Sequence, residues 1–232
     1  MIPFRASGVG KLMAYPDKDT IPEGALSHIY EMASQILLDW QPELNTPEIE
    51  KGRVVEDQSI ALLNQVTGNF YVKNKTRITT DLFTGEWDID EQDEDIIVDI
   101  KSAYSKKTFP IEIKAGDKKL YEWQLDTYMV IRDLNRSAIA YTLVDTPDYL
   151  IKKYENIDWH VVGHIPPERR VTMFYKERDA TREKQLTRRT EICQELLCEI
   201  LDKKGFKFEV AASTTGKYYA AVMAATEVVR VV

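Results

Sequence analysis

The sequence predicts one α/β domain in which apolar strands pack between amphipathic helices. Its 232 residues are enough to bury one sizeable core, and a composition of 44% hydrophobic and 30% charged residues is ordinary for a globular protein. Two apolar, β-branched runs, at 96–101 and 138–144, predict core strands. Apolar residues recur at helical spacing over 25–40 and 118–134, which predicts helices there.

The chain begins with a short helical pattern over residues 9–14. Ser7 precedes it in the position of an N-cap, and Arg5 lies nearby. Free backbone N–H groups beside an arginine can hold a phosphate. An ordinary cap on a docking helix accounts for the same residues, and from this pattern alone we favour the cap.

Residues 46–80 predict a helix followed by strands. Thr46 is the expected N-cap, Pro47 stands at the first helical position, and Gly68 ends the helix. Within it, Glu56 reads as a surface acid on periodicity alone. Residues 70–80 predict a strand or two with a basic edge that faces either phosphate or water, formed by Lys73, Lys75 and Arg77.

The most informative stretch, residues 85–101, reads as two strands joined by an acidic turn. Because side chains alternate along a strand, Asp99 and Lys101 share one face, and a hairpin would bring Asp88 opposite them. Two carboxylates and one lysine in this arrangement suit the binding of a hard cation and the hydrolysis of a phosphodiester. Eight of the fourteen residues 86–99 are acidic, however, and such a run is more often a solvated turn.

Two later features are weaker candidates. Glu112 and Lys114 form a competing acid-X-lysine pair, which we rank second because its apolar run is shorter and lies too far from Asp88 for a tight hairpin. Gln124 and Tyr128, on a predicted helix, are four residues apart and share a face. They would orient a phosphate, a water or the lysine, although an aromatic stripe on an amphipathic helix is the simpler explanation.

The C-terminal part of the chain predicts a long helix over residues 168–204 that ends at Gly205. Its first half is rich in lysine and arginine, which would either contact a nucleic-acid backbone or form an exposed face balanced by glutamates. Residues 207–232 contain β-branched and aromatic runs but no chemistry that we can assign.

Composition excludes several classes of protein. No apolar run approaches the roughly 20 residues of a membrane span, and the N-terminus lacks a signal-peptide core, so we expect a cytoplasmic protein. Cys193 and Cys198 fit neither a disulfide framework nor a zinc or iron–sulfur site. A net charge of −7 argues against a general nucleic-acid coat but is compatible with acids clustered at a metal site.

Four short motifs follow one another along the chain: KGRVVE at 51–56, GEWD at 85–88, VDIK at 98–101 and QLDTY at 124–128. In this order and spacing they resemble the PD-(D/E)XK nuclease superfamily, and most closely its lambda-exonuclease-like branch, also called the YqaJ or RecB-type group. The resemblance covers about residues 1–145, the core of what we interpret as a single nuclease domain of residues 1–232 with a helical and β extension over about 166–232. It implies a mixed central β-sheet flanked by helices, a restriction-endonuclease-like core.

The resemblance also implies a role for each motif residue. Asp88 would be the central metal ligand and Asp99 the second, with the main-chain carbonyl of Ile100 adding an oxygen. Glu56 would bind or position the metal. Lys101 would orient or activate the attacking water and stabilise charge on the phosphate. The cofactor implied is Mg²⁺, for which Mn²⁺ would substitute.

Other residues are implied in substrate binding. Gln124 and Tyr128 match the Q-x-x-x-Y helix of the branch and would support the site or the DNA strand. Arg5 and Ser7 resemble the N-terminal segment that helps hold the 5′ phosphate in lambda-type exonucleases. Arg53 is a further candidate for contact with DNA.

The chain departs from the family pattern at two positions of the site. Asp99 stands where most members of the branch have glutamate, which shifts the carboxylate by one methylene. Trp87 replaces the proline before Asp88. Neither change abolishes the ligand set.

Together these features predict a Mg²⁺-dependent exonuclease that acts on the ends of linear duplex DNA. From the resemblance we expect a single-strand annealing protein as a partner in phage-type recombination, and a trimeric ring as the oligomer. Two alternatives stay open, a structure-specific or restriction-like endonuclease and a non-catalytic DNA-binding module that kept the fold. The iron–sulfur nucleases that share the motifs need four cysteines, and this chain has two.

Overall fold

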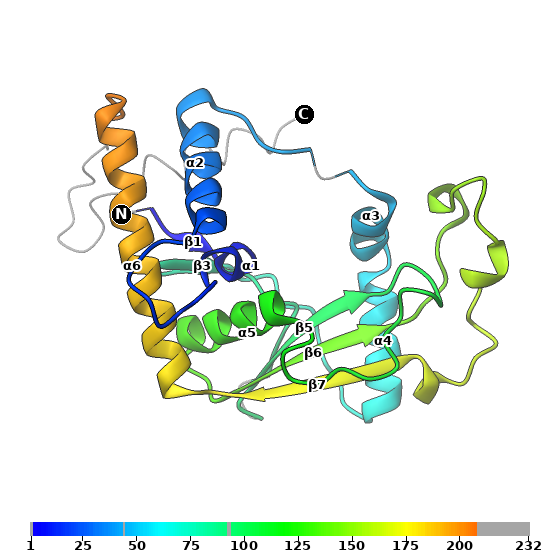
Figure 1. Ribbon diagram of the computed structural model, residues 1–232. Helices are drawn as coiled ribbons and strands as arrows, with labels where there is room; N and C mark the ends of the chain where they lie inside the picture. The colour runs from blue at the N-terminus through cyan, green and yellow to red at the C-terminus, as the bar shows by residue number, and fades with distance from the viewer. Residues whose placement is uncertain (1, 44, 92–93, 208–232) are drawn as a thin grey trace.

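The computed structural model describes residues 2–43, 45–91 and 94–207 (Figure 1). The α-helices are α1 Ala6–Val9, α2 Glu23–Leu38, α3 Pro47–Val54, α4 Glu56–Thr67, α5 Lys119–Arg132 and α6 Ala180–Lys203. The strands are β1 Phe4–Arg5, β2 Ile78–Thr79, β3 Phe83–Gly85, β4 Ile89–Glu91, β5 Ile96–Ser102, β6 Arg136–Thr142 and β7 Val171–Glu177. Single 3-10 turns occupy η1 Gly10–Leu12, η2 Asp148–Leu150, η3 Ile157–Trp159 and η4 Pro167–Arg169.

The larger sheet is mixed and has the strand order β4-β5-β6-β7. β5 and β6 run parallel, with Asp99 opposite Ile139, while β4 and β7 are antiparallel to their neighbours. A smaller sheet has the order β1-β3-β2, with β1 parallel and β2 antiparallel to β3. These mixed sheets, flanked by helices, confirm the predicted fold class.

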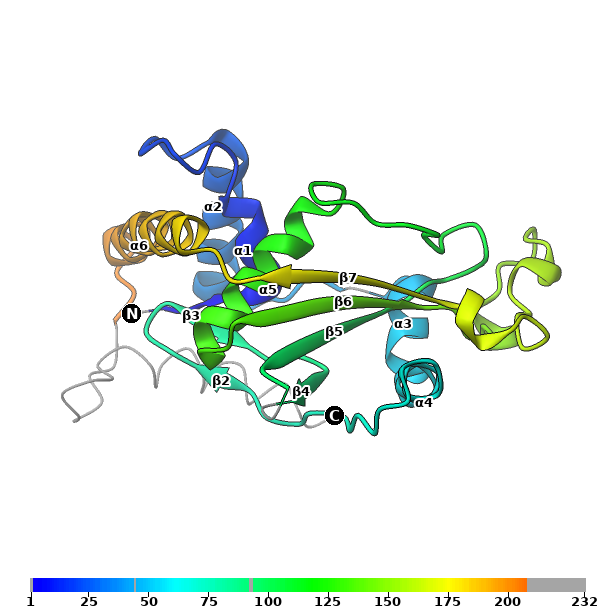
Figure 2. The same cartoon turned by 90° about the horizontal axis from the view of Figure 1, so that it is seen from below.

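Helices cover both faces of the larger sheet (Figure 1, Figure 2). On one face α5 contributes Leu125 to a core that includes Ile97 of β5. On the other face α4 contributes Leu63 to a core that includes Val98. Because successive residues of a strand point to opposite faces, Asp99 shares the face of Ile97 and points toward α5.

The C-terminal helix α6 packs against the N-terminal segment. Leu186 and Leu197 of α6 lie in one core with Ile2 and Phe4. Arg189 of α6 is buried, and its guanidinium donates hydrogen bonds to the main-chain carbonyls of Leu12, Ala14, Tyr15 and Lys18. The N-terminal segment and α6 therefore stabilise each other.

The prediction of a continuous helix over 168–204 is wrong in its first part. Residues 171–177 form β7, which pairs along the whole of β6, and α6 begins only at Ala180. The run VTMFYKE contains β-branched and aromatic residues that favour a strand, and the edge of β6 offers it a row of backbone hydrogen bonds. The part of the predicted extension that lies beyond Lys207 falls outside the described residues.

Two other local predictions are also wrong. The helix predicted after Thr46 divides into α3 and α4 at Val55, which is 1% exposed and has a ψ of 11°. Burying Val55 in the core turns the chain there, whereas the cap at Thr46 and the end at Gly68 are confirmed. The strands predicted over 70–80 are reduced to β2, and residues 69–77 have no regular secondary structure.

The remaining elements follow the predictions closely. The helices expected over 25–40 and 118–134 are α2 and α5, and the strand expected over 138–144 is β6. Within the described ranges, no helix is both long and apolar enough to cross a membrane. Cys193 and Cys198 are free thiols.

Candidate active site

Asp88 lies where the chain passes from the smaller sheet to the larger one, in the short connection between β3 and β4. The register of β4 on β5, which pairs Ile89 with Val98, brings Asp88 beside Asp99 at the next step. The Oδ2 atom of Asp88 accepts a hydrogen bond from the Ile100 amide at 2.5 Å. The chain thus sets two carboxylates side by side, and we call Asp88 and Asp99 the aspartate pair.

Lys101 places an ammonium group directly on this pair. Its Nζ lies 2.5 Å from Oδ2 of Asp99 and 4.9 Å from the centre of the Tyr121 ring. Burial disfavours the charge of Lys101, but the carboxylates of Asp99 and Asp88 more than offset it, so the pKa of Lys101 lies above its usual value. Lys101 is therefore a fixed positive charge at the site.

The aspartate pair carries more negative charge than its surroundings neutralise. Burial and the charge of Asp99 raise the pKa of Asp88 to about 7, although the Ile100 amide and Lys101 act in the opposite direction. A buried carboxylate that resists ionisation gains stability when a further cation binds beside it.

Two side chains of α5 hold Asp99 in place. The Nε2 atom of Gln124 donates to Oδ1 of Asp99 at 3.1 Å and to the Tyr128 hydroxyl at 2.6 Å. The Tyr128 hydroxyl in turn lies 3.2 Å from the main-chain carbonyl of Glu86 and 3.5 Å from Oδ1 of Asp99. Burial and the charge of Asp99 raise the pKa of Tyr128 well above its usual value, so this hydroxyl keeps its proton. Gln124 and Tyr128 thus orient one carboxylate.

Glu56 is the first residue of α4 and is engaged by a lysine. Its Oε2 atom accepts a hydrogen bond from Nζ of Lys73 at 2.6 Å. The charge of Glu56 contributes to the raised pKa of Asp88, so the two acids are within electrostatic reach of each other. Among the residues that the structure describes, no three histidine, cysteine, aspartate or glutamate side chains come together as a metal-binding group. Glu56 is therefore held by Lys73 within electrostatic reach of Asp88, and among the described residues it does not form a three-acid cluster with the aspartate pair.

A small pocket adjoins the aspartate pair at the N-terminus. It has a volume of about 110 Å³ and is lined by Arg5, Ala6, Ser7, Arg77, Thr84, Gly85, Glu86 and Tyr128. Arg77 pairs with Glu86 across it at 2.8 Å. We call it the Arg5 pocket. It brings Arg5 and Ser7 together as predicted, and through Tyr128 it is connected to Asp99.

The predicted cap at Ser7 is wrong. The strand β1 pairs with β3 through Arg5, and α1 begins immediately afterwards at Ala6, so Ser7 stands inside the first turn. The residue in the cap position is Arg5, which makes no capping hydrogen bond. The exposed Ser7 side chain is free to line the Arg5 pocket.

Three candidate residues from the sequence lie apart from the aspartate pair and the Arg5 pocket. Arg53 is on α3, where its side chain is 61% exposed and lies 3.8 Å from Glu50. Glu112 and Lys114 are 3.7 Å apart, and both side chains are 72% exposed. They lie in an irregular loop, so the strand that would set such a pair over a buried partner is missing there.

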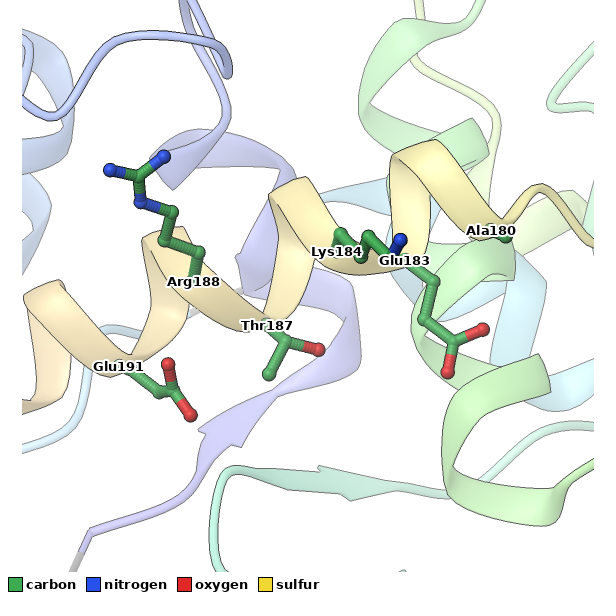
Figure 3. A pocket seen from close by; sticks show the side chains of 6 residues that line it. All are labelled: Ala180, Glu183, Lys184, Thr187, Arg188 and Glu191. Atoms are coloured by element: carbon green, nitrogen blue, oxygen red, sulfur yellow. The ribbon is translucent and has the colours of Figure 1, made fainter.

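A larger pocket of about 540 Å³ lies along one face of α6 (Figure 3). Its lining residues all belong to that helix, and they are Ala180, Glu183, Lys184, Thr187, Arg188 and Glu191. Glu183 is bound by Arg178, and Arg188 is bound by Asp19. These basic residues of the predicted C-terminal helix therefore have acidic partners in the described chain.

No family model and no curated protein matches this chain. Solved structures do match. One is a phage-related exonuclease from Haemophilus somnus 129PT, with a TM-score of 0.82 and 24% sequence identity over 88% of this chain and 96% of that chain. Another is an alkaline exonuclease, LHK-Exo, from Laribacter hongkongensis, with a TM-score of 0.60 and 20% identity over 88% of this chain and 93% of that chain. The same enzyme in complex with dAMP gives a TM-score of 0.61.

The chain has the fold of known exonucleases. Its mixed sheet and flanking helices are those that the motif resemblance implied, and the likeness covers 88% of the chain.

Sequence reasoning did not assign three residues to this site. Lys73 and Arg77 belong to the alternating basic run of 70–80, for which a phosphate-facing edge and a solvated edge both stayed open. Tyr121 lies three residues before Gln124 on α5, so the helical spacing that pairs Gln124 with Tyr128 also sets Tyr121 on the same side of the helix.

Proposed function

We propose that the protein is a metal-dependent DNA exonuclease that hydrolyses phosphodiester bonds from the ends of linear duplex DNA. The observation that carries the proposal is the aspartate pair with Lys101 on it, held by Gln124 and Tyr128. The exonuclease fold supports it.

The residues present fit Mg²⁺. This ion prefers oxygen ligands and is commonly held by one or two carboxylates together with water and substrate phosphate. Asp88 and Asp99 would hold it, with the main-chain carbonyl of Ile100 as a further donor. The Oδ2 atom of Asp99 is buried, and the partner that the described chain gives it is the ammonium of Lys101 at 2.5 Å. When bound, the ion supplies an activated water and a positive charge for the leaving oxygen.

Three residues of the chain would stabilise charge on the phosphate and hold Asp99 in place. Lys101 presents its positive charge beside Asp99, where negative charge develops on the phosphate, and a buried charge acts more strongly than one in water. Gln124 and Tyr128 hold Asp99 in one orientation, which spares the site from reorganising during the reaction.

The Arg5 pocket supports the preference for ends. Arg5, Arg77 and Ser7 line this small pocket, and such a set suits a terminal phosphate. Glu86 also lines it and pairs with Arg77, so Arg5 is the arginine of the pocket that has no acidic partner among the described residues. One of the solved exonucleases was obtained with dAMP, a nucleotide carrying one phosphate. By the family resemblance the proposal extends to cytoplasmic action in phage-type recombination, to a single-strand annealing partner, and to a trimeric ring around the duplex.

The test compares a linear, 5′-phosphorylated duplex with a closed circle of the same sequence. Each is incubated with Mg²⁺, with EDTA, and with the variants Lys101→Ala and Lys114→Ala. We expect loss of the linear duplex alone, dependent on metal and on Lys101 but not on Lys114. Cutting of the circle would instead favour the endonuclease, and binding without cleavage of either substrate would favour a non-catalytic module.

A further inference from the structure

Residues 69–77, between α4 and β2, form an irregular segment that is nevertheless firmly anchored. The Tyr71 amide donates to Oδ1 of Asn64 at 2.8 Å, and Nδ2 of Asn64 donates to the Tyr71 carbonyl at 2.9 Å. The Tyr71 side chain is 8% exposed and packs in the core below the sheet. We call residues 69–77 the basic segment.

Its second anchor lies on the active site itself. The Asn74 amide donates to the main-chain carbonyl of Asp88 at 2.7 Å, and the Asn74 side-chain amide donates to the Trp87 carbonyl at 3.0 Å. The Asn74 side-chain oxygen also accepts from the Thr76 amide at 2.9 Å, which makes a tight turn with Lys75 at its tip. The basic segment therefore lies along the backbone that carries the first aspartate of the pair.

Exposed residues flank the anchors Tyr71 and Asn74. Phe70 is 91% exposed and Val72 is 74% exposed, on either side of the buried Tyr71. Lys75 is exposed and makes no ion pair or hydrogen bond with the described residues. A phenylalanine so fully exposed beside unpaired positive charge is costly to solvate and suits a ligand that offers both an apolar ring face and negative charge.

Two further cations of the basic segment connect it to groups already described. Lys73 binds Glu56 at 2.6 Å, and the charge of Asp88 contributes to raising its pKa, so Lys73 lies within electrostatic reach of Asp88. Arg77 lines the Arg5 pocket. The basic segment thus connects the Arg5 pocket, through Arg77, with the surroundings of Asp88, through Lys73 and Asn74.

We propose that the basic segment is a binding surface for an unpaired DNA strand, in which Lys73 and Lys75 contact phosphates and Phe70 stacks on a base. This inference rests on the proposed function for the polarity of the strand. A strand with its terminal phosphate in the Arg5 pocket and its scissile phosphate at the aspartate pair continues past Phe70. The interior bases of a duplex are covered by their stacked neighbours, whereas the bases of an unpaired strand expose a face to an aromatic ring.

Charge complementarity favours a strand of nucleic acid over an apolar protein partner. The chain as a whole carries a net charge of −7, yet this segment places lysine or arginine at positions 73, 75 and 77. Glu56 and Glu86 pair with the first and the last of these, so Lys75 is the cation that, among the described residues, has no acidic partner. Local positive charge on an acidic protein attracts a polyanion to that place and not to the rest of the surface.

The test measures binding without catalysis. A fluorescent, 5′-phosphorylated single-stranded oligonucleotide is titrated in EDTA against the wild-type protein and the variants Phe70→Ala and Lys75→Ala. Base–aromatic stacking contributes about 1–3 kcal/mol per base, so we expect Phe70→Ala to weaken binding by about 5- to 150-fold. Lys75→Ala is expected to reduce the slope of log K against log salt by about 0.7.

Matched controls come from other parts of the surface. Tyr154 is an aromatic residue with 83% exposure, and Lys184 is an exposed lysine on α6 (Figure 3). Tyr154→Ala and Lys184→Ala are expected to leave both affinity and salt slope within twofold of the wild type. Phe70→Tyr keeps the ring and is expected to retain the affinity, which separates stacking from misfolding.

Equal binding by Phe70→Ala, Lys75→Ala and the two controls would overturn the inference. A contact between copies of this chain would also overturn it, and would appear as a smaller species of Phe70→Ala in sedimentation with unchanged strand binding. Because EDTA removes the metal, the assay measures strand binding separately from the cleavage that the proposed function requires. If Phe70 and Lys75 govern binding but the wild type cleaves nothing with Mg²⁺, the reaction is wrong and the binding surface stands.

Discussion

The chain contains two acid-X-lysine triplets with the same spacing, Asp99-Ile100-Lys101 and Glu112-Ile113-Lys114, and the fold treats them in opposite ways. In the first, the two charged groups are 2.5 Å apart, and the side chains of the acid and the lysine are only 6% and 26% exposed. In the second they are 3.7 Å apart, and both are 72% exposed. Identical spacing therefore yields a buried cluster of charges in one place and a solvated ion pair in the other.

The difference comes from the neighbours of each triplet. β5 lies between β4 and β6, so Asp99 and Lys101 are fixed on a sheet face that α5 covers with Gln124 and Tyr128. Residues 112–114 belong to no strand or helix, and their two charged side chains are exposed although the isoleucine between them packs against the core. An exposed ion pair contributes about 0–1 kcal/mol to stability, whereas charges held away from water interact strongly with each other and with a ligand.

Replacing the lysine of each triplet gives the sharpest contrast between them. Removal of one preorganised donor from an active site typically costs about 10²–10³ in kcat, and we expect a loss of this size for Lys101→Ala on the linear duplex. Lys114→Ala should cleave at the wild-type rate. Activity that survives Lys101→Ala but not Lys114→Ala would show that the exposed triplet is the functional one.

The second prediction concerns the cost of the aspartate pair to the metal-free protein. The pKa of Asp88, about 7, lies above the ordinary value of 3.8, so the folded protein holds a proton that the unfolded chain has lost between these values. Stability then falls as pH rises through this window, by at most about 1.4 kcal/mol per pH unit. Asp88→Asn does not titrate and should be more stable than the wild type at pH 8 in EDTA.

Thermal unfolding at pH 5 and pH 8 checks this prediction. The excess in Tm of Asp88→Asn over the wild type should be larger at pH 8 than at pH 5. Mg²⁺ should raise the Tm of the wild type at pH 8 more than that of the variant, because the ion relieves a repulsion that the variant lacks. Glu112→Gln serves as the matched control. If the Tm of Asp88→Asn exceeded that of the wild type equally at both pH values, the raised pKa of Asp88 would be contradicted.

A smaller effect is expected from the helix that covers the first triplet. Tyr128→Phe removes the hydroxyl that lies near Asp99 and accepts from Gln124, while the ring stays packed against Trp87. A hydrogen bond to a charged group contributes about 1.5–3 kcal/mol, so kcat should fall by roughly 10- to 100-fold with little change in KM for DNA. A change in KM alone would mean that Tyr128 binds substrate and does not position Asp99.

Sequence reasoning reached the features that depend on local pattern. The alternation in β5 predicted that Asp99 and Lys101 share a face, and the helical spacing of Gln124 and Tyr128 predicted a common side of α5. Both follow from the period of one element. The contact of that side of α5 with Asp99 could be proposed only through the family resemblance, because it joins residues 25 and 29 apart in the chain.

The features that sequence reasoning missed depend on distant partners. Lys51 is fully buried, with its ammonium donating to the carbonyls of Ala103 and Val144, and nothing local distinguishes it from a surface lysine. β7 forms by pairing with the free edge of β6, and residues 171–177 contain no signal that identifies this partner. Long-range contacts of this kind decide whether a lysine is buried and whether a strand finds a partner, and the local pattern alone does not show them.

The last and smallest prediction concerns the stability of the second triplet. Glu112→Gln and Lys114→Ala each remove one partner of an exposed pair, so neither leaves a buried charge without a counterion. Surface substitutions of this kind usually change the free energy of unfolding by no more than about 0.5 kcal/mol, and we expect both variants to fall within that limit in urea unfolding at pH 8. A larger loss in either variant would mean that the side chains of residues 112–114 are packed in solution. The two triplets would then differ in their position in the fold and not in their burial.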